Sequence, residues 1–203
     1  MPRSVSAALT GLAFALLSVT PGVAAPSLFG PPPGMSVTAG TPTNRLMLRA
    51  PRKVHLDPQF MRQVVPYASA EPAGTLVVDT GDHFLYLVLG GGKALRYGIG
   101  TAKTGFEWAG THKITNKREW PDWTPPAEML ARRPDIPRHM DGGINNPLGA
   151  RALYIGSTLY RIHGTNEPWT IGGDVSSGCI RMINDDVVDL YGRVKIGAKV
   201  IVL

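Results

Sequence analysis

Cysteine is the scarcest residue in this chain, with a single copy, Cys179, among 203 residues. One cysteine cannot form an intramolecular disulfide, so stability must come from the apolar residues, which at 43% are enough for a core. The length suits one ordinary domain with appendages. Cys179 is therefore either a buried, inert side chain or a thiol with a chemical role.

Aromatic residues are also few, at 7%, and the basic runs are short. No zinc-finger or helix-turn-helix pattern is present, so the sequence predicts no nucleic-acid partner. The net charge of +6 becomes +5 without Arg3, an excess that suits acidic polymers or anionic surfaces. A zinc hydrolase built on His139, His163 and Cys179 is an alternative, but its ligands lack zinc-site spacing. We predict no metal and no cofactor.

No apolar run is long enough to span a membrane, since the longest, from about Ala7 to Val19, falls short of roughly 20 residues. Arg3 precedes this run and small residues follow it up to Ala25, a pattern typical of a secretory signal peptide. We predict a signal peptide at residues 1–25, export to the periplasm or cell wall, and no transmembrane anchor after cleavage.

The remaining chain divides into a leader at residues 26–66 and a domain at residues 67–203. The leader is rich in Pro, Gly, Ser and Thr, which predicts flexibility, and includes a short helix that Asp57 caps and Pro66 ends. Apolar runs bounded by turn residues predict strands at 75–79, 84–89, 94–100, 111–115, 151–155, 158–163 and 199–203. The short turns between the first of these runs favour antiparallel pairing.

One helix is predicted near the C-terminus, with Asn184 or Asp185 as its cap and its apolar face in the core. The irregular stretch from Glu119 to Pro147, which contains Trp and Pro, predicts an ordered insert that covers a binding cleft. No repeat of fixed period is present.

Cys179 follows Ser176, Ser177 and Gly178, and small residues with a glycine allow a tight turn that aims backbone N–H groups at a substrate carbonyl. A catalytic thiol needs a base, and His163 lies sixteen positions earlier on the same segment. The pattern predicts a nucleophile on a tight turn.

The segment from Arg161 to Met182 contains His-Gly-Thr, a proline, Ile-Gly and Ser-x-Gly-Cys-Ile-Arg-Met. It resembles the signature of the L,D-transpeptidase catalytic domain, of the YkuD or ErfK/YbiS type, and the resemblance covers roughly residues 70 to 203. The resemblance implies a mostly β fold, a β-sandwich of mixed sheets with short helices and a lid-like insert.

The resemblance also implies an activity on peptidoglycan stem peptides of the diaminopimelate type. Cys179 would attack the peptide carbonyl, His163 would serve as base, and the carbonyl of Gly164 would orient the imidazole. The oxyanion and substrate would be held by four residues of the segment, namely Ser176, Ser177, Gly178 and Arg181. The backbone N–H groups of Gly178 and Cys179 would be the oxyanion donors. For Arg181, binding a substrate carboxylate and bracing the loop are equal alternatives.

The sequence does not identify the acyl acceptor. A second stem peptide would give a 3-3 cross-link, and a wall-anchored lipoprotein would give protein attachment. Water as the acceptor would make the enzyme an L,D-carboxypeptidase. A non-catalytic wall-binding module is a further alternative, which would have no reason to keep both Cys179 and His163. Ser177 departs from the family, in which many members carry histidine there. Trp169 is a weaker candidate for substrate contact, because it lies inside the same segment.

Overall fold

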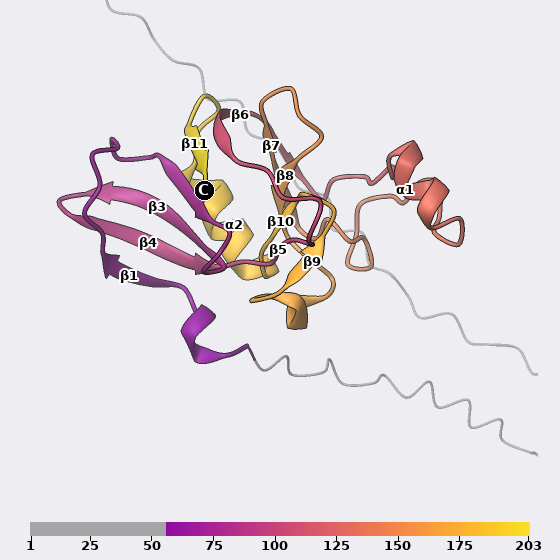
Figure 1. The fold of residues 1–203 in the computed structure, drawn as a ribbon, viewed down its shortest axis with the longest axis horizontal. Coiled ribbons are helices and arrows are strands. Elements are labelled where there is room, and N and C mark those ends of the chain that lie inside the picture. Colours follow the sequence, from indigo (N-terminus) through magenta and orange to yellow (C-terminus); the bar gives the residue numbers. More distant parts are fainter. Residues whose placement is uncertain (1–55) are drawn as a thin grey trace, which may run out of the picture. The chain divides into compact units, whose positions relative to one another are not determined.

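The computed structural model describes residues 56–203, and within them it is built mainly of β-strands (Figure 1). The predicted signal peptide and most of the predicted leader lie outside the described residues. None of the helices within residues 56–203 has the length and apolar character needed to cross a membrane.

Nine strands form one sheet in the order β1-β4-β3-β2-β11-β6-β7-β8-β10. Their bounds are β1 Gln63–Pro66, β2 Leu76–Asp79, β3 Phe84–Gly90, β4 Lys93–Gly98, β6 Gly110–Glu119, β7 Arg151–Ile155, β8 Arg161–His163, β10 Ile180–Arg181 and β11 Lys199–Val202. Two short strands, β5 (Thr101–Ala102) and β9 (Asp174–Ser176), pair with each other in a second sheet.

The sheets are mixed. The β2-β3-β4 meander is antiparallel, as its short turns predicted, but β11 pairs with β2 in parallel, and so does β10 with β8. Parallel neighbours need a long connection, and the β8-to-β10 connection includes β9 and the 3-10 helix η2 (Pro168–Thr170). The predicted fold class, mostly β with mixed sheets and short helices, is confirmed.

Strand β6 joins the two halves of the larger sheet. Its first residues pair with β11 and its later ones with β7, with a register shift between Ile114 and Asn116. Such an irregularity bends a strand and allows the sheet to turn. The sequence predicted this strand only to residue 115, because the partner of its second half, β7, is distant in the chain.

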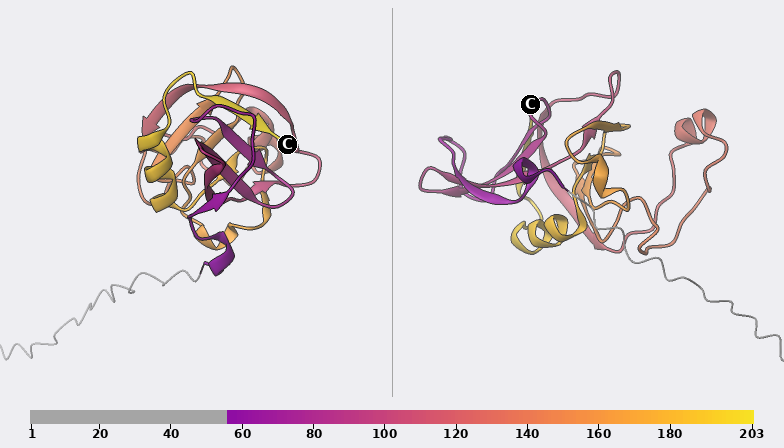
Figure 2. Two further views of the ribbon diagram at one scale, coloured as in Figure 1. Left: turned by 90° about the vertical axis from the view of Figure 1, so that its left-hand side faces the viewer. Right: turned by 90° about the horizontal axis from the view of Figure 1, so that it is seen from below.

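Both halves of the sheet and helix α2 (Asn184–Arg193) contribute to one core. Its buried side chains include Leu76, Val78, Leu85, Tyr97, Ile114, Leu153, Ile155, Ile162 and Ile180. Figure 2 shows α2 along one side of the strands, where it contacts β7. Val187, Leu190 and Val194 bury its apolar face, as predicted.

The predicted side-chain cap of α2 is wrong. The helix begins at Asn184 after Ile183, and neither Asn184 nor Asp185 caps it. The Asn184 side-chain oxygen instead accepts a hydrogen bond of 2.9 Å from the backbone N–H of Ala150. The amide therefore ties the start of α2 to the segment that leads into β7, a long-range contact that overrides the local capping preference.

The chain before β2 belongs to the same sheet. Asp57 accepts from the N–H of Gln59 and caps a 3-10 helix, η1 (Pro58–Phe60), after which β1 pairs with β4. The predicted helix is thus one turn long, because the β-branched residues Val64 and Val65 extend along β4. Phe60 lies against Gly98 and Gly172 so closely that neither position has room for a side chain.

The predicted insert connects β6 to β7 and carries helix α1 (Ala127–Arg132). Figures 1 and 2 show α1 standing away from β8 and β10. The neck of the insert is held by the buried Asn146, whose Nδ2 lies 3.0 to 3.2 Å from three carbonyl oxygens, those of Pro121, Met140 and Asp141. A buried amide with several partners fixes a loop firmly.

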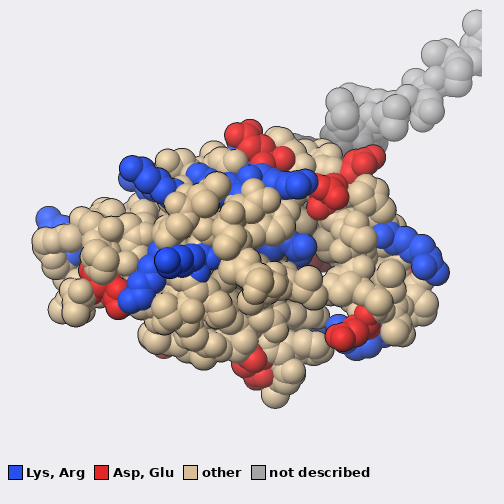
Figure 3. Space-filling model, turned by 90° about the horizontal axis from the view of Figure 1, so that it is seen from above, with Lys and Arg blue, Asp and Glu red and all other residues tan. Residues whose placement is uncertain are grey.

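The net positive charge of the sequence does not come mainly from residues 56–203. Residues 1–55 contain five of the 21 Lys and Arg and none of the 15 Asp and Glu. Figure 3 shows both signs of charge on one face of residues 56–203. Most of the basic excess on which an attraction to acidic polymers depends therefore lies before residue 56.

Candidate active site

The parallel pairing of β8 with β10 brings the predicted nucleophile and base together. Ile180 lies opposite Ile162, and Arg181 lies opposite His163. Side chains alternate along each strand, and the two isoleucines are in the core. His163 and Cys179, the residue before β10, therefore share the opposite face as diagonal neighbours.

The guanidinium groups of two arginines shift the pKa values of both His163 and Cys179. Arg161 and Arg181 disfavour the protonated form of His163 and favour the thiolate form of Cys179. A shared set of charged neighbours agrees with the position of both side chains on one face. The alternation of β8 and β10 also places Arg161 and Arg181 on that face.

His163 is buried, with 4% of its surface exposed, and burial is the main reason that its pKa is lowered to about 3. Its Nδ1 atom lies 2.5 Å from the carbonyl oxygen of Gly164. A carbonyl can only accept, so Nδ1 carries the hydrogen and Nε2 is left as an acceptor. The imidazole is therefore neutral at pH 7 and able to take a proton through Nε2.

Gly164 must be glycine at this position. A Cβ atom there would collide with the side-chain oxygen of Asn184, which also binds Ala150. The residue whose carbonyl orients the imidazole therefore lies next to the first residue of α2.

Cys179 is partly buried, and its Sγ atom lies 4.0 Å from the carbonyl oxygen of Leu159. Burial raises the pKa of the thiol, and the contacts with Arg161 and Arg181 lower it by less. The resting pair is therefore a neutral thiol beside a neutral imidazole. A proton must leave the sulfur as the sulfur attacks.

The turn before Cys179 is closed by Ser176. The Ser176 hydroxyl donates to the carbonyl of Cys179 at 2.6 Å and accepts from the N–H of Gly178 at 3.1 Å. Ser176 is buried and Ser177 is exposed. The N–H of Gly178, predicted as an oxyanion donor, is already engaged, whereas the N–H of Cys179 donates to no protein acceptor within residues 56–203.

Two aromatic residues that the sequence did not single out hold this turn from the side. Trp108 donates through Nε1 to the carbonyl of Gly178 at 2.7 Å, and its ring stacks on Tyr160 with centroids 4.5 Å apart. The Tyr160 ring fills the space where a side chain at position 178 would lie. Gly178 is also at φ +112°, which disfavours any other residue. No spacing in the sequence connects Trp108 with Cys179.

Arg181 forms an ion pair with Glu167, with Nη1 and Oε2 2.9 Å apart. Glu167 lies in the loop that follows His163 and Gly164, so the pair braces that loop, one of the two predicted roles. Trp169 lies on η2 in the same loop with 64% of its surface exposed. Binding of a substrate carboxylate by Arg181 would require the guanidinium to share or exchange this partner.

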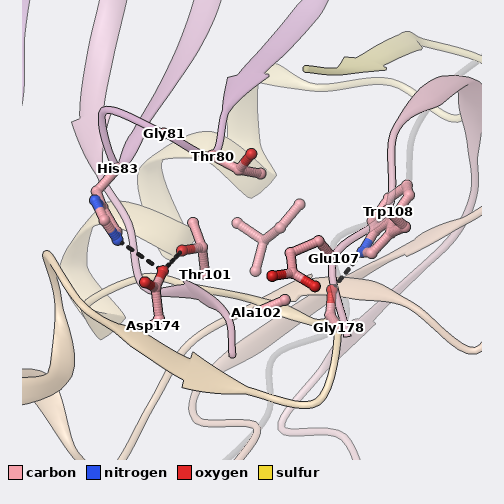
Figure 4. Close-up of a pocket in the computed structure, with 10 residues that line it drawn as sticks. Thr80, Gly81, His83, Thr101, Ala102, Glu107, Trp108, Asp174 and Gly178 are labelled. Atoms are coloured by element: carbon pink, nitrogen blue, oxygen red, sulfur yellow. Dashed lines mark hydrogen bonds and ion pairs between the residues drawn. The ribbon is translucent and has the colours of Figure 1, made fainter. Parts of the chain in front are cut away.

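A cavity of about 220 Å³ lies beside the turn (Figure 4). Asp174 projects into it and binds both His83, at 3.1 Å, and Thr101, at 2.7 Å. Gly178 and Ile180 border the cavity, but Cys179 and His163 do not. The cavity therefore adjoins the turn that carries the thiol, but neither the thiol nor the imidazole lines it.

His139, named in the zinc alternative, lies in the insert, where it contacts Thr124 and Asp141. Within residues 56–203, no group of three or more His, Cys, Asp and Glu side chains has the geometry to hold a metal ion. The structure thus does not bring His139 together with His163 and Cys179.

The fold and the thiol–imidazole face define a class, the L,D-transpeptidase-like β domains. The fold resembles that of an L,D-transpeptidase from Mycobacterium smegmatis, with a TM-score of 0.52 and 19% identity, over 64% of this chain and 58% of that one. The family model for the L,D-transpeptidase catalytic domain (YkuD) matches residues 73–202. The chain belongs to this family, whose members are acyltransferases.

Among curated proteins, a probable L,D-transpeptidase ErfK/SrfK of Escherichia coli is 42% identical over 109 residues, which is 51% of this chain and 34% of that protein. The chain thus spans about a third of the length of this relative. A Brucella melitensis structure described as a probable carnitine operon oxidoreductase is 48% identical, over 73% of this chain and 96% of that one, with a TM-score of 0.49.

Proposed function

We propose that the protein is an exported peptidoglycan L,D-transpeptidase with Cys179 as its nucleophile and His163 as its base. The observation that supports this proposal is the β8–β10 pairing, which has Cys179 and His163 on one face. A wall-binding module without catalysis would not need a buried imidazole whose Nε2 is kept free to accept a proton.

In the first half-reaction, the Cys179 sulfur attacks the carbonyl carbon between diaminopimelate and the terminal D-alanine of a stem tetrapeptide. His163 Nε2 takes the thiol proton, and the tetrahedral oxyanion forms. The C–N bond then breaks, His163 gives its proton to the leaving amine, and D-alanine departs. The product is a thioester between Cys179 and the diaminopimelate carbonyl.

In the second half-reaction, an amine attacks the thioester carbonyl. The C–S bond breaks, the proton of the amine passes through His163 to the sulfur, and the free thiol is restored. A second stem as acceptor yields a 3-3 cross-link, and a lysine of a wall-anchored lipoprotein yields protein attachment. Water as acceptor would make the enzyme an L,D-carboxypeptidase.

Electrostatics support His163 as a base during attack and not as one half of a resting ion pair. The raised pKa of Cys179 and the lowered pKa of His163 both keep the proton on sulfur at neutral pH. The transfer is thus driven by bond formation at the carbonyl. The backbone N–H of Cys179 is the donor that the turn leaves for the oxyanion.

The test uses the mature protein and disaccharide tetrapeptide, followed by intact mass and product analysis. An adduct at the mass of the tripeptide acyl group, with a dimeric muropeptide as product, is the expected result. Tripeptide without dimer would assign hydrolysis in place of transfer. A protein that binds the muropeptide but forms neither adduct nor product would be a wall-binding module, and the proposal would fail.

Acylation should persist at acid pH. The imidazole is an active base only above its pKa, and a pKa of about 3 leaves it neutral at pH 5. An ordinary histidine, with a pKa of about 6.5, would be about 97% protonated there and roughly 30-fold less active. We expect the acylation rate at pH 5 to stay within about threefold of its value at pH 7, as followed by intact mass. A drop of about 30-fold would show that His163 titrates normally.

A further inference from the structure

The peptide unit between Gly178 and Cys179 is held from one side only. Its carbonyl oxygen accepts a hydrogen bond of 2.7 Å from Trp108 Nε1. This peptide is trans, so its N–H points away from its C=O. By fixing the carbonyl of Gly178, Trp108 therefore also fixes the direction of the Cys179 N–H.

The neighbouring groups of the turn have other partners. The N–H of Gly178 and the carbonyl of Cys179 both bind the hydroxyl of Ser176. Within residues 56–203, the hydrogen bond from Trp108 is the only one that the Gly178–Cys179 peptide unit itself makes with the protein. A peptide next to glycine rotates at low steric cost, so without the indole this unit could flip.

The indole is itself rigidly placed. Its ring stacks on Tyr160 with an interplanar angle of 13°, meets His112 edge-on at 5.5 Å, and packs against the core. Tyr160 also contacts the Gly178 side of the turn. The donor is thus held in position before any substrate arrives, which is the condition for effective electrostatic stabilisation of a transition state.

We propose that Trp108 is a positioning residue for the oxyanion donor of this enzyme. Its indole N–H holds the Gly178 carbonyl so that the Cys179 N–H faces the oxygen of the tetrahedral intermediate. This inference rests on the proposed function, because an oxyanion forms only if Cys179 is acylated. Within residues 56–203, the indole N–H of Trp108 is bonded to the Gly178 carbonyl and not to the thiol, so Trp108 acts on the reaction through the peptide.

The test is Trp108→Phe, which keeps an aromatic ring against Tyr160 and removes the N–H. Two rates are measured on the full mature chain: acylation by disaccharide tetrapeptide, which passes through an oxyanion, and alkylation of Cys179 by iodoacetamide, which does not. Loss of one oxyanion donor costs about 10²- to 10³-fold, and partial loss of its orientation should cost less. We expect acylation to fall about 10- to 100-fold and alkylation to change by less than about threefold.

The matched control is Trp120→Phe, which removes the indole N–H of an exposed tryptophan in the insert, so both of its rates should match wild type. Equal acylation by Trp108→Phe and wild type would overturn the inference, and so would a parallel fall in both rates, which would indicate a collapsed turn. If Trp108→Phe does not fold, Tyr160→Leu, which removes the stack, must show the same selective loss of acylation. An unacylated wild type would refute the proposed function instead.

Discussion

Cys179→Ala is expected to eliminate the acyl adduct and to reduce turnover of the tetrapeptide by at least about 10⁴-fold. Loss of the nucleophile removes the covalent route entirely, and what remains in such enzymes comes from binding and the oxyanion site. Intact mass of the variant after incubation with disaccharide tetrapeptide, with product analysis of the same mixture, measures both effects.

The fold should tolerate this substitution. Cys179 is partly buried, and its Sγ makes a long contact with Leu159 and interacts with Arg161, so the change removes one small group. The melting temperature should therefore stay within a few degrees of wild type. An adduct on the folded Cys179→Ala protein equal to that on wild type would place the nucleophile elsewhere.

His163→Gln is expected to slow thioester formation by at least about 100-fold, the usual size of a lost general base. The buried thiol has a raised pKa and then depends on hydroxide to ionise. The remaining rate should rise about tenfold per pH unit between pH 7 and 9, whereas the wild-type rate should be nearly flat there. Glutamine is preferred to alanine because it fills most of the buried site.

Single-turnover acylation, followed by mass over this pH range, measures both features of His163→Gln. His139→Gln is the matched control, since the imidazole of His139 contacts Thr124 and Asp141 in the insert and lies outside the site. Acylation of His163→Gln at the wild-type rate would remove His163 from the mechanism. A flat pH profile with a reduced rate would mean that another base serves the thiol.

The local pattern predicted those strands whose apolar runs are bounded by turn residues, including β11, whose partners β2 and β6 are distant in the chain. Residues 84–89 and 151–155 are apolar runs between turn residues, and the bounds of β3 and β7 agree closely with them. The length of β6, the extended run after η1 and the cap of α2 were mispredicted. In each case a partner far along the chain decided the outcome, and a local window contains no information about that partner.

In the predicted site, too, the sequence identified residues within one segment but not their contacts with distant segments. The sequence named Cys179, His163 and Gly164 from a motif that lies within one segment, and it placed small residues before the thiol. It assigned the N–H groups of Gly178 and Cys179 to the oxyanion, and in the structure the N–H of Gly178 binds Ser176. Small residues permit a tight turn, but they do not determine which of its N–H groups stays free.

The sequence by itself determined the family and the mostly β class and proposed Cys179 and His163 as the reacting pair, because these inferences depend on residue types at short spacing. Only the tertiary structure decided that β8 and β10 run in parallel, that Arg181 pairs with Glu167 and that Trp108 holds the carbonyl of Gly178. Trp108 and Gly178 are 70 positions apart. Their hydrogen bond exists because the β-sheet brings the two segments together, and no pattern along the chain specifies it.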